Sequence, residues 1–215
     1  MKSPVEVKIC GLTSEADAGL LEKYGADYGG MVLFYPKSKR NISLELAGLL
    51  VRRLKKSDIN TVAVVVSPNV SQVTEIENIG FDYIQIHGNL SEEVYNSCGI
   101  NIIRAVNIRN EEADEIQELL EIYKNCDKIS GLLFDAGVPG SGKTFDWDSL
   151  KGINSSGKKL FLAGGLNTAN VFDAIRTVTP DVVDVSSGVE YDNADIKGKD
   201  ENKVKAFMQE AKLRK

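Results

Sequence analysis

The chain has 215 residues, 42% of them hydrophobic and 27% charged, which is enough for one well-buried core but short for two domains of ordinary size. Its 26 basic and 31 acidic side chains leave a formal net charge of −5, with no block of five or more like charges. This pattern argues against nucleic-acid binding and a membrane-surface role, and it fits a solvated cytosolic surface.

Neither a membrane span nor an export signal is visible in the sequence. No segment approaches the ~20 apolar residues that cross a bilayer, and the first residues, MKSPVEVKICG, lack the apolar region of a signal peptide. The three cysteines, Cys10, Cys98 and Cys126, form no CxxC pair, which disfavours a disulfide framework or a structural zinc site. We therefore expect a cytoplasmic protein with neither a membrane nor a nucleic-acid partner.

His87 is the only histidine in the chain. Most acid–base, triad and metal chemistries use one or more histidines. If the protein is an enzyme, its proton transfers therefore fall to a carboxylate, a thiol or a lysine.

Eight apolar runs of strand length recur along the chain, and amphipathic helical patterns lie between them. The runs cover residues 5–12, 28–34, 61–67, 83–88, 102–108, 131–136, 159–166 and 182–189. The clearest helix faces are Ala113, Ile116, Leu119, Leu120 and Tyr123 within 110–126, and Leu46, Leu49, Leu50 and Leu54 in the second helix.

Helix-start residues follow several of the strands, namely Ser14, Asn69 with Ser71, and Asn167 with Thr168. Strict alternation of strands and helices indicates a parallel sheet, and eight such units close into a barrel. We predict an α/β fold, a (β/α)8 TIM barrel, with residues 1–215 as a single domain. An open, doubly wound sheet is the alternative.

The first strand carries two polar side chains on one face, Lys8 and Cys10, while Val7 and Ile9 take the other. In a barrel, the polar pair faces the interior and reaches the mouth, where catalytic residues gather. An ammonium group beside a thiol favours the thiolate, so we expect Lys8 to lower the pKa of Cys10. Cys10 as a small buried hydrophobe is the alternative.

Polar side chains also end the fourth and sixth strands. Asp135 closes the apolar run Gly-Leu-Leu-Phe, and Gln85 and His87 share a face opposite Ile84 and Ile86. These three side chains are expected at the barrel mouth, with a loop cap for Asp135 and a structural role for His87 as the alternatives.

Small residues end the last two strands. The turns contain Gly164 and Gly165 after the seventh strand, and Ser186, Ser187 and Gly188 after the eighth. Backbone amides in such turns can approach an anion, and these two loops form the usual phosphate site of barrels.

Residues 137–144, GVPGSGKT, match the nucleotide-binding P-loop pattern and would make Lys143 and Thr144 contacts to phosphate and magnesium. A P-loop leads directly into a long helix, whereas Phe145, Asp146 and Trp147 indicate a turn and a new helix cap. Asp135 would also place a carboxylate near the phosphates. The context therefore disfavours nucleotide hydrolysis.

The ordered motifs resemble the phosphoribosylanthranilate isomerase family of tryptophan biosynthesis. The motifs are KICGL, Phe34 with KSKRNIS, IQIHG, FDAGVPGSGKTFDW, FLAGGLNTANV, DVSSGVE and GKD, spread from Val7 to Phe207. The resemblance implies a (β/α)8 barrel that converts N-(5-phosphoribosyl)anthranilate into 1-(2-carboxyphenylamino)-1-deoxyribulose 5-phosphate by an Amadori rearrangement. It implies no metal or organic cofactor, and a place as the third step counted from anthranilate formation.

The resemblance also assigns roles to individual residues. Cys10 would be the general base, Asp135 the general acid with a pKa raised by burial, and Arg40 the partner of the anthranilate carboxylate. The amides of Gly165, Ser187 and Gly188 would hold the phosphate, and Asp184 would contact the sugar hydroxyls. Lys8, Gln85 and His87 are further substrate-binding candidates, and Gly164 and Ser186 further phosphate-binding ones.

The chain departs from the family pattern in two places. Gly140-Ser141-Gly142-Lys143 replaces the usual GGTG, which we interpret as a mobile lid, with a substrate contact by Lys143 left open. The stretch from Tyr191 to Lys197 is longer than usual and has no assigned role.

Two rival functions remain beside this one. The related isomerase of histidine biosynthesis performs the same rearrangement but resembles an Asp/Asp pair, which Cys10 disfavours. A catalytically idle barrel that acts as a scaffold is disfavoured by Cys10, Asp135 and the glycine turns. The expected partner is a phosphorylated small molecule, and the protein is expected to be a monomer or a homodimer.

Overall fold

A computed structural model of the chain describes residues 4–108, 113–136, 147–153, 155, 157–193 and 195–212. The strands are β1 (Glu6–Cys10), β2 (Tyr28–Val32), β3 (Asn60–Val66), β4 (Tyr83–His87), β5 (Asn101–Ile108), β6 (Ile129–Ala136), β7 (Lys159–Leu162) and β8 (Val182–Val185). The helices are α1 (Glu15–Tyr24), α2 (Leu44–Lys55), α3 (Val70–Ile79), α4 (Glu92–Ser97), α5 (Ala113–Lys124), α6 (Val171–Val178) and α7 (Glu201–Lys212), with short 3-10 helices η1 (Trp147–Leu150) and η2 (Ser187–Val189).

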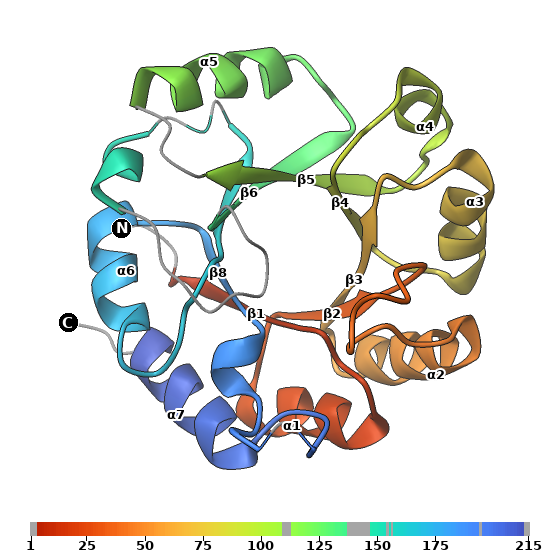
Figure 1. The fold of residues 1–215 in the computed structure, drawn as a ribbon, viewed down its shortest axis with the longest axis vertical. Helices are drawn as coiled ribbons and strands as arrows, with labels where there is room; N and C mark the ends of the chain where they lie inside the picture. Colours follow the sequence, from red (N-terminus) through yellow and green to blue (C-terminus); the bar gives the residue numbers. More distant parts are fainter. Residues whose placement is uncertain are drawn as a thin grey trace.

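The eight strands form a closed barrel in which each strand pairs in parallel with the next and β8 pairs with β1 (Figure 1). The helices surround the strands as an outer ring. The predicted (β/α)8 barrel is confirmed, and the open-sheet alternative is wrong. Each predicted strand has a counterpart within a few residues of its expected bounds.

Local capping explains where several helices begin. The Ser14 hydroxyl accepts a hydrogen bond from the backbone N–H of Asp17 at the start of α1, and Asn69 and Gln72 form a reciprocal capping box at the start of α3. The third expected start is misplaced, because α6 begins at Val171, and Asn167 instead accepts from the Ala169 N–H within the preceding turn.

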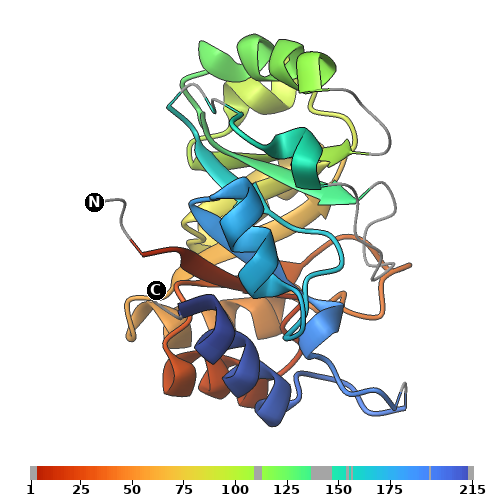
Figure 2. The same ribbon diagram turned by 90° about the vertical axis from the view of Figure 1, so that its left-hand side faces the viewer.

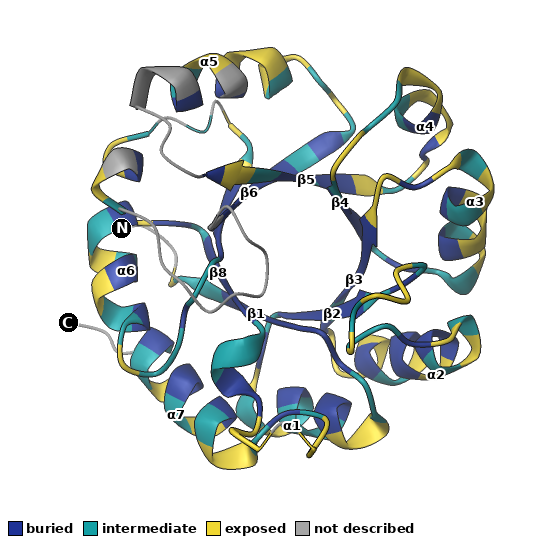
Figure 3. Cartoon of the chain, viewed as in Figure 1, coloured by how far each residue is buried: buried dark blue, intermediate teal, exposed yellow. Residues whose placement is uncertain are grey.

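The apolar side chains divide between two layers. Val7 and Ile9 belong to the layer between strands and helices, whereas Cys10, Leu133 and Phe161 belong to the barrel interior. The strands are buried nearly throughout, while each helix is buried on the side that faces the barrel (Figure 3). Leu49 departs from its expected place on the inner face of α2, since it is 43% exposed.

Aromatic side chains fill the end of the barrel where the strands begin. The Tyr28 ring packs edge-on against Tyr83 and Phe161, and its hydroxyl donates to Glu6 at 2.9 Å. Lys159 closes this group with an ion pair to Glu6 at 2.6 Å. Strand β1 begins at this end, away from the end where β5 and β6 finish (Figure 2). An accessible interior is therefore expected only at the carboxyl ends of the strands.

Candidate active site

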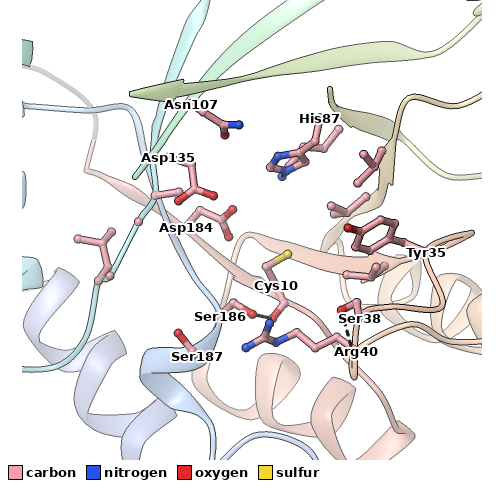
Figure 4. Close-up of a pocket in the computed structure, with 18 of the residues that line it drawn as sticks. Cys10, Tyr35, Ser38, Arg40, His87, Asn107, Asp135, Asp184, Ser186 and Ser187 are labelled. Atoms are coloured by element: carbon pink, nitrogen blue, oxygen red, sulfur yellow. Dashed lines mark hydrogen bonds between the residues drawn. The ribbon is translucent and has the colours of Figure 1, made fainter. Parts of the chain in front are cut away.

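A cavity of about 410 Å³ opens at the carboxyl ends of the strands (Figure 4). Ten of the predicted site residues line it: Cys10, Arg40, Gln85, His87, Asp135, Gly164, Gly165, Asp184, Ser186 and Ser187. Two more, Lys8 and Gly188, lie outside the lining. Lys8 is fully buried on the same face of β1 as Cys10, and Gly188, in the turn after β8, packs against Leu166 in the turn after β7.

Cys10 is the last residue of β1, and its sulfur points into the cavity (Figure 4). A Cβ added at Gly30 would lie 2.9 Å from the Cys10 sulfur and 3.2 Å from the Lys8 nitrogen, so Gly30 leaves room for both groups. Burial raises the pKa of the Cys10 thiol, and Asp184 raises it too, whereas Lys8 and Lys199 lower it only in part. The expected net lowering of this pKa is therefore wrong in sign.

Lys8 and Asp184 form an ion pair inside the barrel. The two residues are register neighbours on β1 and β8, and the Lys8 ammonium lies 2.8 Å from Asp184 Oδ2. Burial alone would lower the pKa of Lys8, but the Asp184 carboxylate and the Cys10 thiol raise it by more. Asp184 Oδ1 is buried and has no hydrogen-bond partner in the part of the chain that the structure describes.

Asp135 lies near the end of β6, where it is 8% exposed and lines the cavity. Its register partner on β5 is Asn107, which lines the same wall. Figure 4 shows Asp135 across the cavity from Cys10. The P-loop-like residues 137–144, with Lys143, lie outside the described residues. Between β6 and β7 the described residues contain only the short helix η1, not the long helix that a P-loop requires.

Gln85 and His87 point into the cavity from β4, as their alternation predicts. The Gln85 side-chain nitrogen lies 2.7 Å from His87 Nε2. Burial, together with the charges of Lys8 and Arg104, lowers the pKa of His87 to about 4. A neutral imidazole at physiological pH can hydrogen-bond to a substrate without acting as a cation.

The turns after β7 and β8 pack tightly together. Gly164 and Gly165 both have positive φ, at 85° and 69°, which glycine adopts without steric cost. A Cβ at Gly188 would collide with the carbonyl oxygen of Leu166, so only glycine allows the two turns to meet. Among the described residues, no hydrogen bond is donated by the backbone amides of Gly165, Ser187 or Gly188. These amides can therefore receive an anion.

Arg40 lies at the rim of the cavity, on the loop between β2 and α2. Its Nε and Nη2 donate to the two carboxylate oxygens of Glu190 at 2.5 and 3.1 Å. Glu190 also accepts from the ammonium group of Lys199 at 3.2 Å. Glu190 and Lys199 lie within the DVSSGVE and GKD motifs, but their side chains received no role from the sequence.

Other cavity residues were missed as well. Tyr35, Ser38 and Asn107 line the cavity beside the apolar Val32, Val64 and Val66. Val32 and Val64 follow the inward alternation of β2 and β3, a signal that was available. Tyr35 and Ser38 belong to a loop, whose path alternation does not predict.

The long stretch from Tyr191 to Lys197 is an excursion closed at its base. Glu190 and Lys199 form an isolated antiparallel bridge, and Lys203 pairs with Asp192 at 2.6 Å. Lys199 N–H donates to Asp17 Oδ1 at 2.8 Å, which ties this base to α1. The stretch therefore leaves the barrel and returns beside Glu190.

The described residues contain neither a metal-binding cluster nor a membrane-spanning helix. No cluster of three or more His, Cys, Asp or Glu side chains has metal-binding geometry within them. No helix in that part of the chain has the length and apolar character needed to cross a membrane.

Comparisons with known proteins agree on one family. The model of the N-(5'-phosphoribosyl)anthranilate (PRA) isomerase family matches residues 7–210. The N-(5'-phosphoribosyl)anthranilate isomerases of Aquifex aeolicus and Streptococcus pneumoniae are 38% and 37% identical to this chain. The first alignment covers 97% of this chain and 98% of the relative, and the second covers 96% of each.

Solved structures show the same likeness. The phosphoribosyl anthranilate isomerase of Thermotoga maritima superposes with a TM-score of 0.82 at 35% identity, over 97% of this chain and 98% of that one. A phosphoribosyl anthranilate isomerase in complex with reduced 1-(o-carboxyphenylamino)-1-deoxyribulose 5-phosphate has a TM-score of 0.80 at 33% identity, with the same coverage. The structure of monomers generated from the dimeric Thermotoga maritima protein has a TM-score of 0.79 at 34% identity, over 97% of this chain and 98% of that one. The chain, an isomerase, therefore belongs to the N-(5'-phosphoribosyl)anthranilate isomerase family.

Proposed function

We propose that the protein converts N-(5-phosphoribosyl)anthranilate into 1-(2-carboxyphenylamino)-1-deoxyribulose 5-phosphate, as the third step of tryptophan biosynthesis counted from anthranilate formation. The observation that carries this proposal is the placement of Cys10 and Asp135 on opposite walls of one cavity (Figure 4). An Amadori rearrangement needs an acid at the ring oxygen and a base at C2, and these two groups supply them without a cofactor.

In the first step, Asp135 gives its proton to the furanose ring oxygen, and the C1–O bond breaks to leave a protonated Schiff base. The Cys10 thiolate then removes the proton from C2, and the C2 electron pair forms the enolamine. Tautomerisation to the C2 ketone completes the reaction. The rise in the pKa of Asp135 that this acid role calls for stays a prediction.

The charges around Cys10 support its role as a base. Lys8 lies on the same face of β1 and lowers the thiol pKa in part, while burial holds that pKa above its ordinary value. The thiolate is therefore a minor, strongly basic species in the free protein. A positively charged Schiff base in the cavity would stabilise it when the proton at C2 must be removed.

The remaining residues divide by substrate group. Arg40 binds the anthranilate carboxylate, and Gly164, Gly165, Ser186, Ser187 and Gly188 bind the phosphate through their turns. Asp184 Oδ1, which is buried and without a partner among the described residues, accepts from a sugar hydroxyl. Gln85 and His87 supply neutral hydrogen-bonding groups from β4, and Lys8 holds Asp184 in place.

The experiment that tests this function follows the fluorescence of N-(5-phosphoribosyl)anthranilate after the protein is added. The signal should decay, and both Cys10→Ser and Asp135→Asn should slow the decay by orders of magnitude. Undiminished turnover by Cys10→Ala would overturn the mechanism. Nucleotide hydrolysis that is lost in Lys143→Ala would support the P-loop alternative instead.

We also propose a cytoplasmic location, a single domain over residues 1–215, and a monomeric or homodimeric state. The dimeric Thermotoga maritima relative and its monomers support both oligomeric states. Sedimentation at several protein concentrations distinguishes them for this chain.

A further inference from the structure

Four charged side chains form a cluster beside the cavity, which we name the Glu190 cluster: Glu190, Arg40, Lys39 and Lys199. One carboxylate faces three cations, with Arg40 at 2.5 Å, Lys39 at 2.9 Å and Lys199 at 3.2 Å. Lys199 is fully buried, and its ammonium group also donates to the Ser186 carbonyl at 3.1 Å. Residues 39–40 and residues 186–199, which are far apart in sequence, thus meet at Glu190.

The orientation of the guanidinium group follows from these contacts. Glu190 occupies Nε and Nη2, which form the lateral edge of Arg40. Nη1 donates no hydrogen bond within the described part of the chain. The terminal edge, made by Nη1 and the second hydrogen of Nη2, is therefore left for another planar carboxylate.

The aliphatic part of Arg40 packs closely against Gly11, which has no side chain. Gly11 has a φ of 78°, and a Cβ there would collide with Arg40 Cδ and lie 3.1 Å from the Ser186 hydroxyl. The side chain of Arg40 thus lies across the end of β1, next to Cys10. Glu190 fixes the orientation of the guanidinium head through its two hydrogen bonds.

We propose that Glu190 is a positioning residue that orients Arg40 for the carboxylate of the anthranilate ring. The proposal rests on the proposed function, in which Arg40 binds that carboxylate. Because Lys199 joins Glu190 to the Ser186 carbonyl, the same cluster sets the position of Arg40 relative to the turn that holds the phosphate. The two anionic ends of the substrate are thereby held at a fixed separation.

The test compares two ligands in two proteins. The ligands are reduced 1-(o-carboxyphenylamino)-1-deoxyribulose 5-phosphate and the same compound built from aniline, which lacks the ring carboxylate. Glu190→Gln can accept only one of the two Arg40 hydrogen bonds. This variant should bind the carboxylated ligand about threefold to tenfold more weakly, which is the cost of ordering one long side chain on binding. Its affinity for the aniline compound should be unchanged. KM should rise and kcat should hold, because the carboxylate contact persists in the transition state.

A matched control exists on the surface. Glu22 holds Arg53 by the same lateral edge, with Nε at 2.9 Å and Nη2 at 2.7 Å, between α1 and α2. Glu22→Gln should change the affinity for neither ligand. If Glu190→Gln does not fold, as judged by circular dichroism, Glu190→Asp replaces it, because Asp keeps the charge beside Lys199 but is too short for both contacts.

The outcomes separate the two proposals. An unchanged ratio of the two affinities in the folded Glu190 variant would overturn the positioning role, including the case where both ligands weaken alike. A wild-type protein that turns over substrate but does not prefer the carboxylated ligand would overturn the role of Arg40, and that of Glu190 with it. A wild-type protein without turnover would overturn the proposed function itself.

Discussion

The ammonium nitrogen of Lys8 lies 2.8 Å from Asp184 Oδ2, and the Lys8 side chain has no exposed surface. Both side chains are close enough to Cys10 for their charges to shift the pKa of its thiol. Lys8 lowers the Cys10 pKa and Asp184 raises it, while burial raises it most. The two charges therefore act on the thiol in opposite directions, which allows each to be tested separately.

Lys8→Met should remove the cation that lowers the Cys10 pKa, and leave Asp184, whose pKa burial already raises, without its ion-pair partner. The rise of kcat/KM with pH, which follows formation of the thiolate, should move to higher pH. The free energy of unfolding should fall by about 3–5 kcal/mol, the usual cost of breaking a buried ion pair. A pH–rate profile measures the shift in kcat/KM, and urea titrations measure the free energy of unfolding.

Asp184→Asn is the control with the opposite sign. It removes the charge that raises the thiol pKa, so the same limb should move to lower pH even though turnover falls. If kcat/KM rises at the same pH in the wild type and in both variants, neither charge affects the pKa of Cys10.

His87 offers a direct spectroscopic test because it is the only histidine in the chain. Its imidazole NMR signals should stay constant from pH 8 to pH 5 and titrate with a midpoint at about 4, because burial disfavours the cation. Unfolding in urea should return the midpoint to about 6.5. A midpoint between 6 and 7 in the folded protein, with any purification tag removed, would contradict a neutral His87 at physiological pH.

Local patterns in the sequence were sufficient to predict the barrel. Each strand is a nearly continuous apolar run, and Ser14 and Asn69 cap helices where their positions indicate. Alternation along β1 and β4 placed Lys8, Cys10, Gln85 and His87 inside, because side chains two apart on a strand share a face.

The Glu190 cluster was beyond such patterns. Arg40 and Glu190 are 150 residues apart, and their contact depends on how a loop and η2 meet in three dimensions. The sign of the Cys10 pKa shift was missed for a related reason. The sequence places Lys8 beside Cys10, but the depth of burial and the position of Asp184 exist only in the folded barrel.

Gly188→Ala should weaken phosphate binding, since the added Cβ would collide with the Leu166 carbonyl and push the two turns apart. We expect a higher KM, a weaker inhibition by inorganic phosphate, and a loss of about 1–3 kcal/mol in the free energy of unfolding from overpacking.

Gly48→Ala on α2 is the matched control, because its Cβ would meet only Arg52 Nη1 at 3.4 Å. That variant should be about 0.5–1 kcal/mol more stable with unchanged kinetics. Equal KM values in both variants would contradict the role of the turn contact.

Stability at acid pH should report the Glu190 cluster. The Arg40, Lys199 and Lys39 cations outweigh burial and lower the pKa of Glu190 from its ordinary 4.5 to about 2. A carboxyl group whose pKa is lower in the folded state stabilises the fold above its unfolded pKa, and that stabilisation is lost as the pH falls from about 4.5 to about 2. Over this range the free energy of unfolding of the wild type should fall by about 3 kcal/mol more than that of Glu190→Gln, since each unit of pKa shift corresponds to about 1.4 kcal/mol.

Urea titrations between pH 5.5 and pH 2 measure this difference. Glu22→Gln, which removes a more exposed carboxylate, should differ less from the wild type. Parallel curves for the wild type and Glu190→Gln would mean that the three cations do not stabilise the Glu190 carboxylate.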